Sequence, residues 1–426
     1  MKIRHVRITP IAFRDPPLLN AAGIHEPWAL RSIIELETDT GLVGINETYG
    51  DLPVLEAMAK VAPQLVGLDP WALNEMELRV RATVQPAGTG PGFSGPEFSL
   101  APGTHASKAA VKVISAFEVA MLDLQGQQVG APVSDLLGGA VRDRVPYSAY
   151  LFYKYAEHFG QPYAPDPWGE ALTPEQLVAQ ARQMIGQYGF RSIKLKAGAL
   201  PPEQEAAGLQ ALAQAFPGRP LRIDPNGNWS VATSLKVVEQ LRGVLEYYED
   251  PAPGLEGMAA VARECEVPLA TNMVVTDFPE FRRNVELGCP VKIVLSDHHY
   301  WGGLRATQQL STLCQTFDLG LSMHSNSHLG ISLVAMTHLC AAVPRLTYAC
   351  DTHYPWQDDE VIAGGRLKFE DGSLKVPTGP GLGVTIDRDA LARLHNNYQL
   401  CGIRNRNDLA QMRKYDPAFT GRQPRF

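Results

Sequence analysis

The first part of the chain alternates apolar with polar or charged residues, as β-strands with one buried face do. Longer stretches in which apolar residues recur at helical spacing come next. Together the two patterns predict a small α+β unit. Its expected elements are strands at residues 2–8, 31–38 and 42–47, followed by helices at residues 51–66 and 71–84.

A long amphipathic helix follows a segment rich in turn-forming residues. Residues 86–103 contain five Gly and four Pro, which predicts a loop rather than a helix or a strand. Beyond this loop, apolar residues recur at the spacing of one helix face. The stripe consists of Ile114, Phe117, Met121 and Leu124. Gly126 lies just beyond the stripe and marks the expected end of the helix.

From about residue 145 the pattern changes to short apolar runs that alternate with helical stretches. Two of the helices carry start signals, a capping box from Thr173 to Gln176 and Ser230 as an N-cap. The runs lie at residues 147–152, 192–196, 221–224, 245–249, 268–272, 291–297, 319–324 and 347–353. Eight strands alternating with helices predict a parallel sheet, and eight βα units close naturally into a barrel.

The composition is that of a folded chain long enough for two domains, since 45% of its 426 residues are hydrophobic and 19% are charged. A net charge of −7 without a basic block argues against binding to nucleic acid or to an anionic membrane. No apolar run reaches the roughly 18 residues of a transmembrane helix, and the N-terminal pattern is that of a strand rather than a signal peptide. We therefore expect a cytoplasmic protein. The six cysteines form no CxxC pair, so we expect reduced, buried thiols.

A polar residue closes seven of the eight predicted strands. These residues are Lys196, Asp224, Glu249, Asn272, Asp297, His324 and Asp351. They are 23 to 28 residues apart, about the length of one βα unit. The carboxyl ends of the strands of such a barrel share one face, and that face carries the chemistry. Any single one could merely end a strand or cap a helix, but seven in a row favour a shared site.

Three consecutive strand ends, Asp224, Glu249 and Asn272, supply oxygen atoms that could meet at one point. Two carboxylates and a carboxamide suit a hard cation such as Mg²⁺, which prefers oxygen ligands at about 2.0–2.1 Å. The set lacks the His and Cys ligands that zinc prefers. The alternative is that Asp224 and Asn272 only cap helices. Glu249 is followed by Asp-Pro, however, which does not resemble an ordinary helix entry.

Two further pairs of side chains could move protons. Lys194 and Lys196 stand two residues apart on one strand and so point to the same side. Two adjacent ammonium groups disfavour full protonation, which would make one lysine a base near neutral pH. Asp297 beside His324 would fix the tautomer of the imidazole and raise its basicity. A lysine, a His–Asp pair and a divalent ion between them fit removal of the proton next to a carboxylate.

These motifs, and nearly the whole chain, resemble the enolase superfamily and, within it, the glucarate dehydratase group. The matching segments are residues 116–139, KLK at 194–196, DPNGNW at 224–229, YEDP at 248–251, ATNM at 270–273, DHHYW at 297–301, HSN at 324–326, DTH at 351–353 and GPGLG at 379–383. Asn as the third metal ligand is a specific mark of the group. The resemblance implies an α/β fold: a TIM-like (β/α)7β barrel at residues 141–375 with an α+β capping domain. Residues 1–140 and a returning C-terminal segment, 376–426, would form the cap.

The resemblance also implies a role for each residue of the site. Mg²⁺ would bind the three oxygen ligands. Lys196, tuned by Lys194, would act as the base on one face of the reacting carbon. His324 with Asp297 would act on the other face, and Asn226 would contact the substrate or this His–Asp pair. Residues that match substrate contacts of the family are Asn20, His25, Tyr150, Phe152, Ser325, Asn326, His353 and Arg406.

The implied activity is dehydration of D-glucarate. The proton next to a carboxylate is removed and the β-hydroxyl leaves with His324 as the acid, giving 5-dehydro-4-deoxy-D-glucarate. Segments 86–103 and 154–171 depart from the family pattern and should border the pocket, and Thr104 is a candidate for a threonine contact of the family. A dehydratase or epimerase of another hexarate, such as galactarate or L-idarate, therefore stays open.

Two rival functions belong to other classes. A non-catalytic relative that only binds acid sugars is a more distant alternative, because all the bases are present. A nicotinamide dehydrogenase is weaker still, since no GxGxxG follows a first strand. The family is often oligomeric, which leaves a homo-oligomer open.

Overall fold

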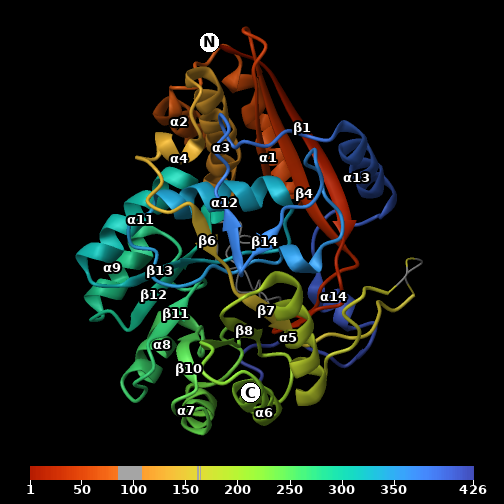
Figure 1. Ribbon diagram of the computed structural model, residues 1–426, viewed down its shortest axis with the longest axis vertical. Helices are drawn as coiled ribbons and strands as arrows, with labels where there is room; N and C mark the ends of the chain where they lie inside the picture. The colour runs from red at the N-terminus through yellow and green to blue at the C-terminus, as the bar shows by residue number, and fades with distance from the viewer. Residues whose placement is uncertain (85–107, 161–162, 164) are drawn as a thin grey trace.

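The computed structural model describes residues 1–84, 108–160, 163 and 165–426, with a capping sheet above a barrel (Figure 1). The segment 86–103 and Thr104 lie outside the described residues. The capping sheet is antiparallel, in the order β1-β4-β5. Its strands are β1 (Ile3–Arg14), β4 (Trp28–Thr38) and β5 (Val43–Tyr49). The three predicted strands are confirmed, and β1 extends six residues further because its end pairs with β4 around the buried Phe13.

Helices cover the capping sheet, and two short strands lead from it towards the barrel. The helices that pack on the sheet or on one another are α1 (Leu52–Leu65), α2 (Leu73–Thr83), α3 (Ala109–Val129) and, from the C-terminal part of the chain, α13 (Arg388–Leu400). A hairpin of β2 (Leu19–Asn20) and β3 (Gly23–Ile24) connects β1 to β4. The short helix α14 (Asp408–Met412) packs against β3. The C-terminal segment therefore returns to the N-terminal sheet, whereas the domain boundaries near residues 140 and 375 stay predictions.

Helix α3 runs past the end that the sequence predicts at Gly126. It continues to Val129 and ends where Gly130 takes the left-handed conformation, with a φ of 71°. Gly126 stays within the helix because other backbone crosses it closely: a Cβ there would lie 2.7 Å from the Cα of Gly381 and 2.6 Å from the carbonyl oxygen of Ala131. This glycine is explained by close packing rather than by helix termination.

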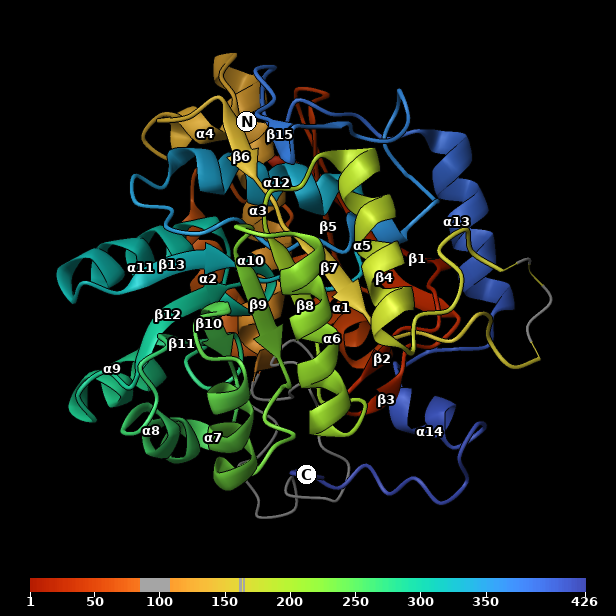
Figure 2. The ribbon, with the colours of Figure 1, turned by 60° about the horizontal axis from the view of Figure 1, so that its bottom comes forward.

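Seven parallel strands form the barrel sheet in the order β13-β12-β11-β10-β9-β8-β7. They are β7 (Ala149–Phe152), β8 (Ile193–Lys196), β9 (Leu221–Asp224), β10 (Leu245–Glu249), β11 (Leu269–Thr271), β12 (Val291–Ser296) and β13 (Gly320–Met323). Helices between the strands surround the sheet (Figure 2). They are α5 (Pro174–Tyr188), α6 (Pro202–Ala215), α7 (Val231–Gln240), α8 (Gly254–Ala262), α9 (Phe278–Glu286), α10 (His298–Trp301), α11 (Leu304–Thr316) and α12 (Gly330–Ala342). The capping box at Thr173 and the N-cap at Ser230 are confirmed.

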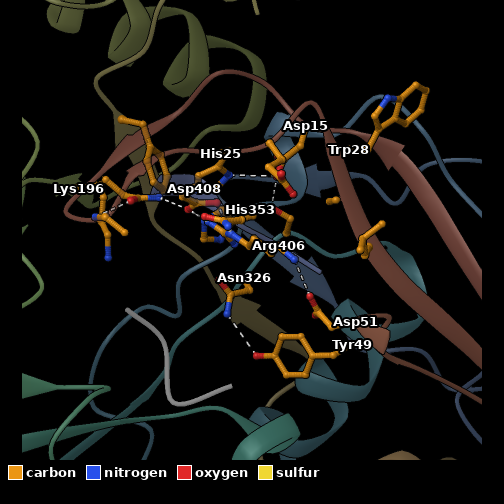
Figure 3. A pocket seen from close by; sticks show the side chains of 18 of the residues that line it. Asp15, His25, Trp28, Tyr49, Asp51, Lys196, Asn326, His353, Arg406 and Asp408 are labelled. Carbon is orange, nitrogen blue, oxygen red and sulfur yellow. Dashed lines mark hydrogen bonds and ion pairs between the residues drawn. The ribbon is translucent and has the colours of Figure 1, made fainter. Parts of the chain in front are cut away.

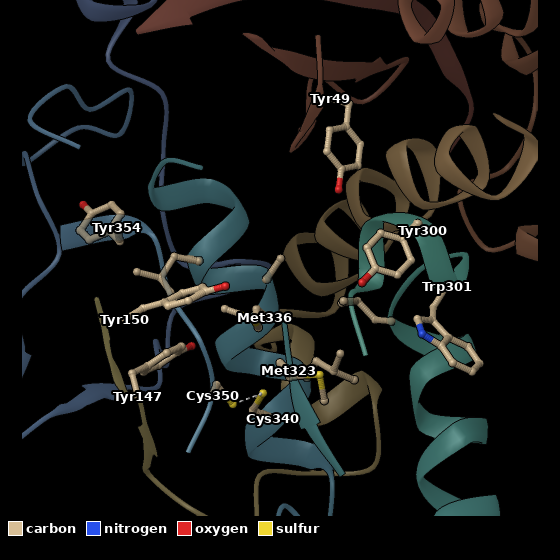
Figure 4. Close-up of a cluster of buried hydrophobic side chains, with 14 of the residues drawn as sticks. Tyr49, Tyr147, Tyr150, Tyr300, Trp301, Met323, Met336, Cys340, Cys350 and Tyr354 are labelled. Carbon is tan, nitrogen blue, oxygen red and sulfur yellow. Dashed lines mark hydrogen bonds between the residues drawn. The ribbon is translucent and has the colours of Figure 1, made fainter. Parts of the chain in front are cut away.

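The eighth predicted strand, at residues 347–353, is not a regular strand. It still closes the barrel, because Cys350 donates its N–H to Pro146 beside β7 and Asp351 donates its N–H to Met323 of β13, both at 2.9 Å. The Thr347 hydroxyl accepts the N–H of Leu321 at 2.7 Å, so a side chain replaces part of the strand ladder. Figure 4 shows Cys350 next to Cys340 at this seam, with 3.5 Å between the two sulfur atoms.

Short elements complete the described chain. They are α4 (Val133–Leu136), β6 (Arg144–Pro146), the 3₁₀-helix Tyr354–Trp356, β14 (Phe369–Glu370) and β15 (Ser373–Lys375). The strands β14, β15 and β6 form a separate small sheet. All six cysteines are free thiols, and three of them are fully buried. No helix in the described part of the chain has both the length and the apolar character needed to cross a membrane.

We predict that Gly44→Ala destabilises the contact between β5 and α3. A Cβ at residue 44 would overlap the carbonyl oxygen of Ala120 and lie 2.5 Å from Cγ of Leu124, so backbone must move. The expected loss in free energy of unfolding is about 1–3 kcal/mol, measured by chemical denaturation.

Gly186→Ala is the control for this substitution. Gly186 lies on the exposed side of α5 with no atom near its added Cβ, and alanine is the better helix former there. This variant should be as stable as the unmodified protein or more so. Equal stability losses in both variants would contradict the close approach of β5 to α3.

Candidate active site

A cavity of about 320 Å³ lies at the carboxyl ends of the barrel strands, under the loops of the cap (Figure 3). Most of the sequence-predicted site residues line it. They are Asn20, His25, Tyr150, Phe152, Lys196, Asn226, Asn272, His324, Asn326, His353 and Arg406. The other predicted residues are buried next to the cavity without lining it. They are Lys194, Asp224, Glu249, Asp297 and Ser325. Residues from the cap and from the barrel thus meet around one space.

Lys194 is buried among carboxylates. Its Nζ lies 2.6 Å from Glu249 Oε2, 2.6 Å from Asp351 Oδ2 and 3.7 Å from Asp224 Oδ2. Burial alone would lower the pKa of Lys194, but Asp351 and Glu249 raise it well above its usual range. At Lys194 the three acidic side chains around the ammonium group outweigh the expected repulsion from Lys196, so Lys196 stays the lysine predicted to act as the base. Asp351 was predicted only as a strand end, and its pairing with Lys194 was missed.

Asp224 and Glu249, two of the expected metal ligands, differ in the charges that surround them. Asp224 accepts a hydrogen bond from Lys196 Nζ at 2.7 Å. Burial would raise the pKa of Asp224, but Lys196 and Lys194 lower it, so this group is held as a carboxylate. Burial and the charge of Asp224 instead raise the pKa of Glu249 well above its usual value. A cation between the two would relieve this repulsion.

The third expected ligand has an oxygen available for such a cation. Asn272 is 1% exposed, and its Oδ1 accepts no hydrogen bond from any described residue. Its loop is fixed from two sides, by Asp250 Oδ2, which accepts the Asn272 N–H at 3.0 Å, and by the Tyr300 hydroxyl, which donates to the Asn272 carbonyl at 3.2 Å. Asp250 lies close to the other two carboxylates, but the Thr271 hydroxyl and the Asn272 N–H occupy its oxygens. The donor set therefore fits Mg²⁺ without Asp250.

The His–Asp pair forms at the ends of β12 and β13. His324 Nδ1 lies 3.2 Å from Asp297 Oδ2, which leaves Nε2 as the ring nitrogen available to a ligand in the cavity. Asp297 has a second partner that was not predicted, since His299 Nδ1 lies 2.7 Å from Asp297 Oδ1. Burial would raise the pKa of Asp297, but His299 and His324 hold it well below its usual range. Asp297 is therefore an ionised acceptor for two imidazoles.

Asn226 lies beside one of the expected metal ligands. Its backbone has a φ of 50°, and its side-chain amide donates to Asp224 Oδ1 at 2.9 Å and to the sulfur of Met273 at 3.3 Å. In the described structure it makes no hydrogen bond to His324 or Asp297, so of the two contacts that the resemblance implies, the one with the substrate stays a prediction. The side chain still lines the cavity next to Asp224.

The cap supplies two further pairs of charged groups to the opposite side of the cavity (Figure 3). His25 Nδ1 lies 3.0 Å from Asp15 Oδ2, and burial of Asp15 is outweighed by His25, which lowers the pKa of this carboxyl. Arg406 binds Asp408 through both Nε and a terminal nitrogen, at 2.8 and 2.6 Å, and Asn20 donates to the same carboxylate at 2.7 Å. Asp15 and Asp408 were not predicted, because no strand-end pattern marks them.

Aromatic rings form one wall of the cavity. The rings of Tyr150 and Phe152 are 4.6 Å apart, and His353 packs against both, at 4.9 and 5.3 Å between centroids. The Ser325 hydroxyl lies 2.9 Å from Nδ1 of His353 and so orients this ring rather than facing the cavity itself. Asn326 donates to the Tyr49 hydroxyl of the cap at 3.2 Å.

Comparison with known proteins agrees with this architecture. Residues 176–390 match the family model described as enolase C-terminal domain-like, and residues 12–138 match the N-terminal domain of mandelate racemase and muconate lactonizing enzyme. A probable glucarate dehydratase of Streptomyces coelicolor is 51% identical over 98% of this chain and 97% of its own length.

Two solved structures are also close. An enolase-type protein of Pseudomonas fluorescens, with bound magnesium, potassium and tartrate, is 60% identical with a TM-score of 0.96, over 100% of this chain and 99% of its own. One from Thermobispora bispora, complexed with magnesium and formate, is 56% identical with a TM-score of 0.94, over 100% of both chains. Because family models match both parts of the chain and a relative is 51% identical over nearly its full length, the chain belongs to the enolase superfamily.

Proposed function

We propose that the protein is a Mg²⁺-dependent acid-sugar dehydratase and that its substrate is D-glucarate. The observation that carries the proposal is the meeting of Lys196, the His324–Asp297 pair and the free oxygen of Asn272 around one cavity. The similarity to a probable glucarate dehydratase over nearly the full length of both chains supports the choice of substrate.

In this proposal Mg²⁺ is held by Asp224, Glu249 and Asn272. When bound, the ion supplies positive charge that stabilises the negative charge developing on the substrate carboxylate as the neighbouring proton leaves. The magnesium reported in two similar structures supports this cofactor. The orphaned Oδ1 of Asn272 and the mutual repulsion of Asp224 and Glu249 are the features of this chain that support the same assignment.

The two bases come from strands that are not neighbours in the sheet. Lys196 ends β8 and His324 follows β13, so each approaches the cavity from its own side. Either group can take the proton next to the carboxylate, according to the configuration of the substrate carbon. The imidazole, with Asp297 on Nδ1, can then give a proton from Nε2 to the departing β-hydroxyl. Both residues are largely buried, at 6% and 4% exposed.

The cap residues would hold the distal end of the diacid. His25 and Arg406 offer hydrogen-bond donors there, and each is fixed by its own carboxylate, Asp15 or Asp408. Because these carboxylates offset much of the positive charge, directed hydrogen bonds rather than net charge would select the distal carboxylate. Epimerisation of a hexarate is the second candidate, since bases approaching from two sides could remove and return a proton on opposite faces.

We predict turnover of D-glucarate by the purified protein in the presence of Mg²⁺. The measurement is formation of an α-keto acid, run beside galactarate and L-idarate as comparison substrates. Rapid turnover of another hexarate with none of D-glucarate would reject the substrate but keep the chemistry. Exchange of the substrate proton with deuterated water, without any keto product, would favour the epimerase.

We predict that Lys196→Ala and His324→Ala slow proton exchange on different epimers of the substrate. Loss of one base should reduce proton exchange by about 10²–10⁴-fold for the hexarate whose proton faces that base, with a smaller effect on its epimer. The measurement is deuterium incorporation into D-glucarate and L-idarate by nuclear magnetic resonance. Full activity of both variants on both epimers would contradict the two-base assignment.

We predict that Asn272→Ala weakens Mg²⁺ binding at least about tenfold, because a ligand oxygen is lost. Isothermal titration calorimetry with Mg²⁺ alone measures this without substrate. Asn326→Ala is the matched control, since Asn326 lines the same cavity but bonds to Tyr49 of the cap. Unchanged affinity in Asn272→Ala would remove this residue from the ligand set.

A further inference from the structure

A buried row of hydrogen bonds connects the capping sheet to the His–Asp pair. It begins at Arg31 of β4, which is 2% exposed and whose terminal nitrogen lies 2.8 Å from His299 Nε2. His299 Nδ1 lies 2.7 Å from Asp297 Oδ1, and the other oxygen of Asp297 lies 3.2 Å from His324 Nδ1. Four side chains thus join the cap to the base that faces the cavity.

The chemistry of arginine fixes the direction of the bonds that His299 makes in this row. A guanidinium group only donates, so His299 Nε2 must accept and carries no proton. The proton of the neutral ring then lies on Nδ1 and is donated to Asp297 Oδ1. A second proton on Nε2 would face the positive charge of Arg31 directly. The same oxygen of Asp297 also accepts the backbone N–H of His299 at 2.9 Å, so Oδ2 remains for His324.

Arg31 itself is held firmly between the two parts of the molecule. Its Nε donates to Glu47 at 3.1 Å, and its guanidinium lies 4.9 Å from the centre of the Tyr49 ring. Glu47 in turn accepts backbone N–H groups of Leu329 and Ser332, at the start of α12 in the barrel. Figure 4 shows Tyr49 projecting from the cap towards the barrel elements that carry Tyr300. Movement of the cap against the barrel would therefore move Arg31 relative to His299.

We propose that Arg31 and His299 are positioning residues for proton transfer by His324: Arg31 keeps the proton of His299 on Nδ1, and His299 thereby keeps Asp297 Oδ2 aligned with His324. This proposal rests on the proposed function, since it concerns the His324 half of the reaction. It assigns to the cap a part in the chemistry as well as in substrate binding. Lys196 has no member of this row among its hydrogen-bond partners in the described structure.

The test uses His299→Phe, which keeps a ring of similar size but cannot donate, and His299→Asn, whose amide can replace the Nδ1–H donor. We expect His299→Phe to lower proton exchange about 10–100-fold on the same epimer that His324→Ala disables, as loss of a supporting group does. Exchange on the epimer that depends on Lys196 should be unchanged. His299→Asn should recover part of the loss, and His395→Phe, on α13 of the cap, should leave both epimers unaffected.

Imidazole ¹⁵N spectra of the Mg²⁺-loaded protein test the proton positions without any substrate. His299 should carry its proton on Nδ1 in the unmodified protein, and Arg31→Lys, which retains the charge but shortens the reach, should shift part of it to Nε2. In His299→Phe the Nδ1 proton of His324 should lose its fixed position. A proton on Nε2 of His299 in the unmodified protein would overturn the proposal, as would equal loss of exchange on both epimers. Absence of any hexarate exchange would instead reject the proposed function, and the spectra would still decide the proton positions.

Discussion

The site depends on keeping like charges together in a place that water does not reach. Asp224, Glu249 and Asp351 are at most 1% exposed, and burial by itself would drive such groups to take up protons. Lys194 and Lys196, two residues apart on β8, supply counter-charges that lower the pKa of Asp224, whereas burial and the charge of Asp224 keep the pKa of Glu249 raised. A divalent cation bound between Asp224 and Glu249 would relieve their repulsion and supply the positive charge that a diacid needs at this end of the cavity. In the proposed function, metal binding would thus be a condition for substrate binding.

Much of the barrel and its floor could be predicted from the chain because both follow local rules. Parallel strands place their carboxyl ends at one edge of the sheet. The regular sequence separation of Asp224, Glu249 and Asn272 is therefore enough to predict that these three residues lie near one another. The eighth segment is not the predicted strand: its apolar pattern is strand-like, but hydrogen bonds to Pro146 of β6 and to β13 hold it without a regular ladder. Periodicity reports which side chains are buried, and it cannot report how the backbone is bonded.

The site residues that the sequence does not predict are missed for a different reason. Asp15, His299 and Asp408 reach their partners through contacts between the cap and the barrel or within loops, and no spacing in the sequence encodes those contacts. Ser327 and Gln357, for instance, donate to Asp15 from more than 300 residues away. A histidine two residues after a strand end also resembles an ordinary start of a helix, which is where His299 lies. Charge pairs of this kind become visible only when the chain is folded.

The short hairpin of β2 and β3 carries residues of the cap to the cavity. It brings Asn20 and His25 over the barrel mouth, and α14 beside it brings Asp408 and Arg406. None of these residues lies on a barrel strand, whereas Lys196, Asp224 and Glu249 end barrel strands. Mutations that change substrate specificity can therefore arise in different parts of the sequence from mutations that change the reaction. Substitutions in these cap segments could alter which substrate binds while the catalytic residues of the barrel stay the same.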